Sequence, residues 1–208
     1  KYFILTLSCL CWGSLQAQKQ PQVWLTDVKQ NILFVQQNNK AENLATGENN
    51  INIDPSKSYQ SIDGFGYTLT GGSAQHLLAM EKSARKAILT ELFATDKNNI
   101  GTSYLRLSIG ASDLNDQVFS YNDLPEGETD LSMSKFDLGP DKKEIIPVLK
   151  EILAINPKVK LMGSPWSPPA WMKTNNATKG GSLKPEFYDA YALYFVKYIQ
   201  AMKANGLT

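Results

Sequence analysis

Two tryptophans, Trp166 and Trp171, lie in a proline-rich segment that follows a short apolar run. Pro165, Pro168 and Pro169 restrict the backbone and remove three amide donors, so this segment is predicted to be a rigid loop. An indole ring combines a large apolar face with one N–H donor, which suits the C–H face of a sugar and its hydroxyls. We therefore predict that Trp166 and Trp171 bind a carbohydrate. The alternative, which applies more to Trp171 because Trp166 stands beside a strand end, is that the ring fills the core.

An arginine interrupts the predicted strand at 102–109, where apolar and polar residues alternate. The alternation places Leu105, Leu107 and Ile109 on one face and Tyr104, Arg106 and Ser108 on the other. A fixed positive charge on a buried strand is costly unless a carboxylate meets it. We therefore predict that Arg106 binds substrate or holds a catalytic carboxylate. A structural salt bridge at the rim of the fold, with no part in the reaction, is the alternative.

Several other chemistries lack the residues they need. His76 is the only histidine and Cys9 and Cys11 are the only cysteines, so we predict no metal site and no histidine-based triad. The glycines at Gly64 and Gly71 do not complete a dinucleotide-binding loop or a nucleophile elbow. We expect no cofactor.

Charge and the first residues indicate an exported protein. A net charge of +1 without a basic patch makes nucleic acid an unlikely partner. Residues 2–15 are largely apolar and follow a lysine, so residues 1–17 are predicted to be a signal peptide that is cleaved near Ala17. A membrane anchor is the alternative, although the stretch is short for a span of about 20 apolar residues. We predict a secreted or periplasmic bacterial protein, without a stable membrane span once the signal is removed.

The remaining chain divides into two parts. Residues 18–60 are polar, with β-prone pieces at 23–26 and 32–36, and are predicted to contribute strands to an accessory all-β domain. Residues 61–208 alternate between strand and helix, which favours a parallel α/β sheet. The expected strands cover 102–109 and 159–163, the expected helices cover 74–80, 83–94, 141–154 and 185–204, and a polar loop covers 111–134.

The polar strand face favours a (β/α)8 TIM barrel, in which such residues point to the active-site mouth, over a doubly wound sheet. About three βα units are present, whereas a barrel takes about 250 residues. The barrel is therefore predicted to be incomplete in this chain, which also lacks an initiator methionine and is expected to be a fragment.

Several motifs, in order, resemble glycoside hydrolase family 30, the glucosylceramidase-like and β-1,6-glucanase-like family. The segment from Ser164 to Asn175 is similar to the family signature SPW-x-x-P-x-W-[LM]-K-T-N. Further matches are Gly64-Phe65-Gly66, Arg106 to Asp113, Tyr121-Asn122-Asp123 and Gly181-Ser182-Leu183-Lys184. The resemblance covers roughly two thirds of the chain, and it concerns only the amino-terminal part of the family's catalytic domain.

The resemblance implies a retaining β-glycosidase with two carboxylates about 5 to 5.5 Å apart. It places both beyond Thr208, so no catalytic residue is predicted in this segment. It also implies that Arg106 stands beside the carboxylate pair. The helical glutamates are predicted to be solvent-exposed rather than catalytic (Glu81, Glu91, Glu144, Glu151 and Glu186), and Asp113 and Asp123 are predicted to cap turns.

One position departs from the family. In glucosylceramidases the matching threonine is followed by an aspartate that binds the terminal glucose, whereas here Thr70 is followed by Gly71. We therefore predict that Gly71 shapes the substrate site. The expected substrate is a β-linked glucan or another glucosyl conjugate, with glucosylceramide possible. The alternative function is a non-catalytic glycan-binding protein on the same barrel.

Overall fold

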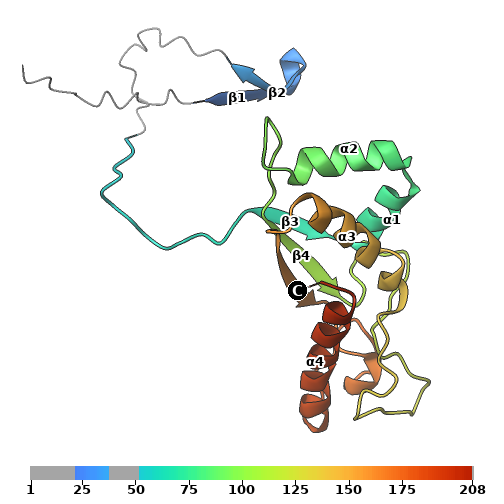
Figure 1. Ribbon diagram of the computed structural model, residues 1–208. Helices are drawn as coiled ribbons and strands as arrows, with labels where there is room; N and C mark the ends of the chain where they lie inside the picture. Colours follow the sequence, from blue (N-terminus) through green and yellow to red (C-terminus); the bar gives the residue numbers. More distant parts are fainter. Residues whose placement is uncertain (1–21, 38–51, 208) are drawn as a thin grey trace, which may run out of the picture. The chain divides into compact units, whose positions relative to one another are not determined.

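The computed structural model describes residues 22–37 and 52–207 in two units, which divide between Tyr59 and Gln60 (Figure 1). Each unit is described by itself. The predicted signal peptide at 1–17 lies outside the described residues. In the described part of the chain, no helix is both long enough and apolar enough to cross a bilayer.

The first unit contains a β-hairpin. Strand β1 (Val23–Asp27) pairs antiparallel with β2 (Ile32–Gln37), and the short helix η1 (Val28–Gln30) connects them. The Asp27 carboxylate caps η1 by accepting hydrogen bonds from the backbone amides of Lys29 and Gln30. Both predicted strands are present, and their place in a larger accessory β-domain stays a prediction.

The second unit is built on a parallel sheet of three strands in the order β3-β4-β5. These strands are β3 (Gly66–Leu69), β4 (Tyr104–Ile109) and β5 (Lys160–Pro165). The connecting helices are α1 (Gly71–Ala79), α2 (Lys82–Phe93) and α3 (Ile145–Ile155), and α4 (Tyr188–Ala204) follows β5. Short helices η2 (Gly139–Lys142), η3 (Ala170–Met172) and η4 (Pro185–Phe187) interrupt the loops.

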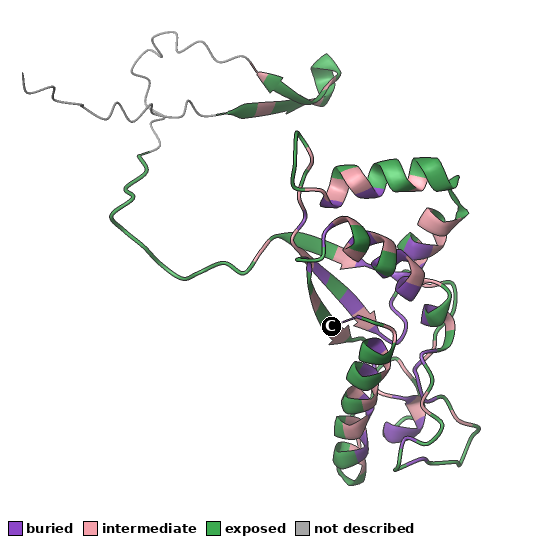
Figure 2. Ribbon diagram, in the orientation of Figure 1, coloured by how far each residue is buried: buried purple, intermediate pink, exposed green. Residues whose placement is uncertain are grey.

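The helices pack against one face of this sheet. Leu105, Leu107 and Ile109 of β4 are at most 5% exposed, and Figure 2 shows the alternation of burial along the strand. Phe93 at the end of α2 contacts the Tyr67 ring of β3, and Tyr198 of α4 packs over Gly163 of β5. A doubly wound sheet carries helices on both faces, so this one-sided cover, with strands in sequential order, is the arrangement of a barrel segment.

Helix ends differ from the expectation where a cap or a proline decides them. Helix α1 begins three residues earlier than predicted because the Thr70 hydroxyl accepts a hydrogen bond from the Ser73 amide. The predicted helix at 141–154 is two helices, since Pro147 can stand only in the first turn of α3. Helix α4 ends at Ala204, as expected, and just beyond it Gly206 takes a φ of 79° while the Leu207 amide donates to the Met202 carbonyl.

Candidate functional site

The uncovered face of the sheet carries Arg106. Its guanidinium donates a hydrogen bond to Ser164 Oγ on the neighbouring strand at 3.0 Å. Thr68 of β3 and Met162 of β5 flank Arg106 in the sheet register, and together they line a shallow cavity of about 310 Å³. Arginine, threonine and serine side chains therefore meet on one face, as the alternation in the sequence predicts.

One residue that lines this cavity, Gly66, must be a glycine. A Cβ atom at Gly66 would lie 1.5 Å from the Tyr104 carbonyl oxygen, so only glycine allows β3 to approach β4 here. The described residues form five salt bridges, and none involves Arg106. The carboxylate partner of Arg106 therefore stays a prediction. In the structure the guanidinium is exposed, with room beside it for a charged group from another segment.

Trp166 follows the last residue of β5 and exposes 43% of its surface. Behind it, the buried Ser167 hydroxyl donates to the Pro168 carbonyl at 2.9 Å and accepts from Lys173 Nζ at 3.3 Å. Lys173 is itself buried and also donates to the Thr178 carbonyl at 2.7 Å, and burial lowers its pKa. The ring is thus held on a firmly bonded backbone and is available to a ligand. Sequence reasoning missed Lys173, because a lysine is rarely a buried residue.

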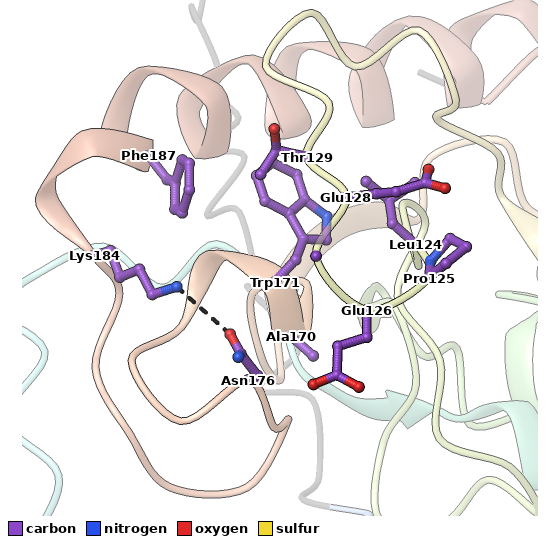
Figure 3. Close-up of a pocket in the computed structure, with 11 residues that line it drawn as sticks. Leu124, Pro125, Glu126, Glu128, Thr129, Ala170, Trp171, Asn176, Lys184 and Phe187 are labelled. Carbon is purple, nitrogen blue, oxygen red and sulfur yellow. Dashed lines mark hydrogen bonds between the residues drawn. The ribbon is translucent and has the colours of Figure 1, made fainter.

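Trp171 is placed differently. It is 8% exposed, and its N–H donates to the Asn122 carbonyl oxygen at 3.0 Å and to Asn122 Oδ1 at 3.1 Å. Its ring meets Phe187 edge to face at 5.0 Å. The indole N–H is therefore already bonded within the protein. Only the part of the ring that lines the cavity in Figure 3 can meet a ligand.

Gly71 is the first residue of α1, and its missing side chain makes room for another loop. A Cβ atom at Gly71 would lie 1.9 Å from Asn115 Nδ2. Asn115 is held there because its Oδ1 accepts hydrogen bonds from the amide and hydroxyl of Ser112, at 2.9 and 3.0 Å. The space of an acidic side chain at position 71 is thus filled by an amide from the loop after β4. The sequence carried no signal for Asn115.

Asp123 and Asp130 shape the loop after β4. Asp123 accepts hydrogen bonds from the amide and hydroxyl of Ser120, at 2.8 and 2.6 Å, which is the predicted turn role. Burial alone would raise the pKa of Asp130, but bonds from the Lys135 amide, Asn122 and two serines hold that pKa well below its usual range. Asn122 in turn receives the Trp171 N–H, so this network joins the loops after β4 and β5.

A second acidic group lies in the core. The Tyr121 hydroxyl donates to the buried Asp141 carboxyl, and Tyr121 stacks on Tyr198 with ring centroids 5.9 Å apart. The pKa of Asp141 is raised to about 7, mainly because the carboxyl is buried. The hydrogen bond from Tyr121 lowers this pKa, and the nearby charge of Glu144 raises it. Glu144 is not a free surface group, since it accepts a hydrogen bond from Gln75 at 3.0 Å. Asp141 serves the helical side of the sheet, not the Arg106 face.

No described segment gathers three histidine, cysteine, aspartate or glutamate side chains in a metal-binding arrangement. Of the glutamates predicted to be non-catalytic, Glu151 forms an ion pair with Arg85 at 3.0 Å between α2 and α3. The arrangement can therefore contribute a positive charge, a hydroxyl and an exposed indole to a ligand, but it holds no pair of carboxylates near Arg106 among residues 22–37 and 52–207.

Comparisons with known proteins identify the family of the second unit. The model of the glycosyl hydrolase family 30 TIM-barrel domain matches residues 62–208. An endo-1,6-beta-D-glucanase of Neurospora crassa is 34% identical over 163 residues, which cover 76% of this chain and 33% of that protein. The lysosomal acid glucosylceramidase of Mus musculus is 33% identical over 162 residues, with coverage of 76% and 31%.

Solved structures agree with this placement. A solved endo-beta1,6-glucanase superposes with a TM-score of 0.66 at 42% identity, over 74% of this chain and 34% of the other. SrfJ from Salmonella typhimurium superposes with a TM-score of 0.68 at 31% identity, over 74% and 34%. The predicted TIM-barrel class is thereby confirmed. The chain spans about a third of the length of the relatives that it matches.

Proposed function

Because the chain belongs to glycosyl hydrolase family 30, we propose that the full-length protein is a β-glycosidase that hydrolyses a β-linked glucan. The observation that carries this proposal is the face of the sheet that bears Arg106. The Arg106 guanidinium on β4 donates a hydrogen bond to Ser164 on β5, and Trp166, directly after β5, is exposed. In a barrel of this kind, the carboxyl ends of the strands form the active site.

We propose a β-1,6-glucan as the first substrate to test. The similarity to a solved endo-beta1,6-glucanase at 42% identity supports it. So does Gly71, because Asn115 fills the space where the resemblance to glucosylceramidases calls for a glucose-binding aspartate. Glucosylceramide stays the second candidate, since the mouse glucosylceramidase is also similar to the chain.

The proposed mechanism retains the configuration of the sugar and uses two carboxylates about 5 to 5.5 Å apart, one as nucleophile and one as acid and base. Both carboxylates are proposed to come from the part of the protein that follows residue 208. Arg106 then holds the nucleophile, because a guanidinium favours the ionised form of a carboxyl beside it. Ser164 fixes the direction of the guanidinium, and Trp166 holds the reacting sugar.

The test is product analysis with the full-length protein on β-1,6-glucan, β-1,3-glucan and glucosylceramide. The expected result is cleavage of β-1,6-glucan, with a product whose first-formed anomer is β by NMR. An α anomer as the first product would exclude the retaining mechanism. Binding of glucan without any hydrolysis would instead identify a non-catalytic glycan-binding protein.

We also propose that the protein is exported after cleavage near Ala17, that residues 18–60 belong to an accessory β-domain, and that residues 61–208 belong to the barrel. The apolar segment at 2–15 supports export. Sequencing of the mature amino terminus from the periplasmic and secreted fractions tests it. An uncleaved chain in the membrane fraction would favour the anchor instead.

A further inference from the structure

A second cavity lies between the loop that follows β4 and the loop that follows β5 (Figure 3). It has a volume of about 500 Å³. One wall is the segment 124–129, and the other wall is formed by Ala170, Trp171, Asn176, Lys184 and Phe187. None of these residues lines the cavity beside Arg106.

Its walls combine opposite kinds of polar group with aromatic surface. Glu126 offers carboxylate oxygens as acceptors, and Lys184 offers an ammonium donor. Glu128 also lines the cavity, but its carboxylate is paired with Lys135 at 2.6 Å. Lys184 Nζ lies 3.5 Å from Asn176 Oδ1 and 5.6 Å from the centre of the Phe187 ring. Acceptors and donors around an aromatic surface suit a neutral polyhydroxylated ring. A phosphate would be repelled by the Glu126 carboxylate, and an apolar ligand would leave the charges without solvent.

The walls are held in place before any ligand binds. Asp130 accepts four hydrogen bonds next to the segment 124–129, and one of them comes from Asn122. Asn122 also receives the Trp171 N–H, which ties the two walls together. The tip at Gly127 is a closed turn, with a φ of 81° and a hydrogen bond from the Glu128 amide to the Pro125 carbonyl. A rigid cavity loses little entropy when a ligand binds.

Both walls belong to loops that follow the carboxyl ends of β4 and β5, which are neighbouring parallel strands. In a barrel, substrates bind at this end of the strands. Ala170 lies in the same loop as Trp166, four residues further along. We propose that this cavity binds one hexose unit of a β-linked glucan, away from the bond that is cleaved. This inference rests on the proposed function, and it gives the protein a reason to prefer a polymer over a single glucoside.

The test compares two substrates in the full-length protein: β-1,6-glucan and a nitrophenyl β-glucoside, which has a single sugar unit and so occupies only the position where the bond is cleaved. The test variants are Glu126→Ala and Lys184→Met. The matched controls are Glu186→Ala and Lys179→Met, because both residues are exposed and neither lines the cavity. We expect the ratio of kcat/KM for the polymer to kcat/KM for the glucoside to fall about tenfold in each test variant, as for loss of a hydrogen bond to a charged group. The controls should keep the wild-type ratio.

Titration with a β-1,6-gluco-oligosaccharide by calorimetry gives a second readout that does not need catalysis. Weaker binding in the test variants alone supports the cavity, even if the protein hydrolyses nothing and the proposed function fails. Wild-type ratios and wild-type affinities in both test variants, in an enzyme that does cleave the glucan, would overturn the cavity and leave the proposed function standing. A wild-type protein that neither cleaves nor binds the glucan overturns both.

Discussion

Asp141 makes the stability of the barrel depend on pH in an unusual direction. A carboxyl in an unfolded chain has a pKa near 3.8, whereas burial raises the pKa of Asp141 to about 7 in the fold. Between these two values the folded protein keeps a proton that the unfolded chain releases, so its free energy of unfolding falls as the pH rises. At about 1.4 kcal/mol per pH unit, the loss between pH 4 and pH 7 reaches at most roughly 4 kcal/mol.

Asp141→Asn removes the titration and keeps an oxygen that can accept the Tyr121 hydroxyl. We expect the variant and the wild type to have similar melting temperatures near pH 4, and the variant to become the more stable of the two as the pH approaches 8. Thermal unfolding of the full-length protein, followed by circular dichroism from pH 4 to pH 8, measures this. Asp137→Asn is the control, because hydrogen bonds from Lys142 and from the Gly139 amide lower the pKa of Asp137. That carboxyl is ionised in both the folded and the unfolded chain above about pH 5, so the curve of this variant should run parallel to that of the wild type from there to pH 8. Parallel pH curves for Asp141→Asn and wild type would refute the argument.

Three further predictions concern the candidate site. Arg106→Lys should lower kcat at least tenfold and move the acidic limb of the pH–rate profile to higher pH, because an ammonium cannot make the two-point contact with the nucleophile; an unchanged profile would mean that Arg106 only supports the barrel. Trp166→Ala should cost about 2 to 4 kcal/mol of transition-state binding, measured as kcat/KM. Trp171→Phe should act mainly on the melting temperature, since its N–H bonds lie inside the protein; the reverse pattern would contradict the placement of the two rings. Gly71→Asp should destabilise the fold by about 1 to 3 kcal/mol in a denaturant titration, because the new side chain meets Asn115. Adding Asn115→Ala should restore much of that loss in the double variant. Additive losses would show that the two side chains do not compete for one space.

The framework of the second unit could be predicted because its signals are local. Alternation along β4 separates Leu105 and Leu107 from Arg106, and the same alternation decides which face the helices cover. Helix limits were predicted less well, since they depend on single groups. The Thr70 hydroxyl extends α1 at its start, and Pro147 divides the predicted helix at 141–154.

The site could be predicted only where a residue's own strand decides its place. Arg106 qualifies, because the strand period alone sends it to the polar face. The places of the two tryptophans could not be predicted in this way. They have the same residue type and lie in the same rigid loop, but they differ in the residues that they contact. Trp171 is buried because Asn122, 49 residues earlier in the chain, accepts its N–H, and no local pattern signals that pairing.

The same limit explains Gly71, and it changes how its departure from the glucosylceramidases is understood. From the sequence alone, the glycine looks like the loss of a sugar-binding carboxylate. In the structure the space is occupied, because Asn115 from the loop after β4 points its amide into it and is held there by Ser112. We therefore predict that the substrate preference of the full-length protein depends on the conformation of the loop after β4 as much as on residue 71 itself.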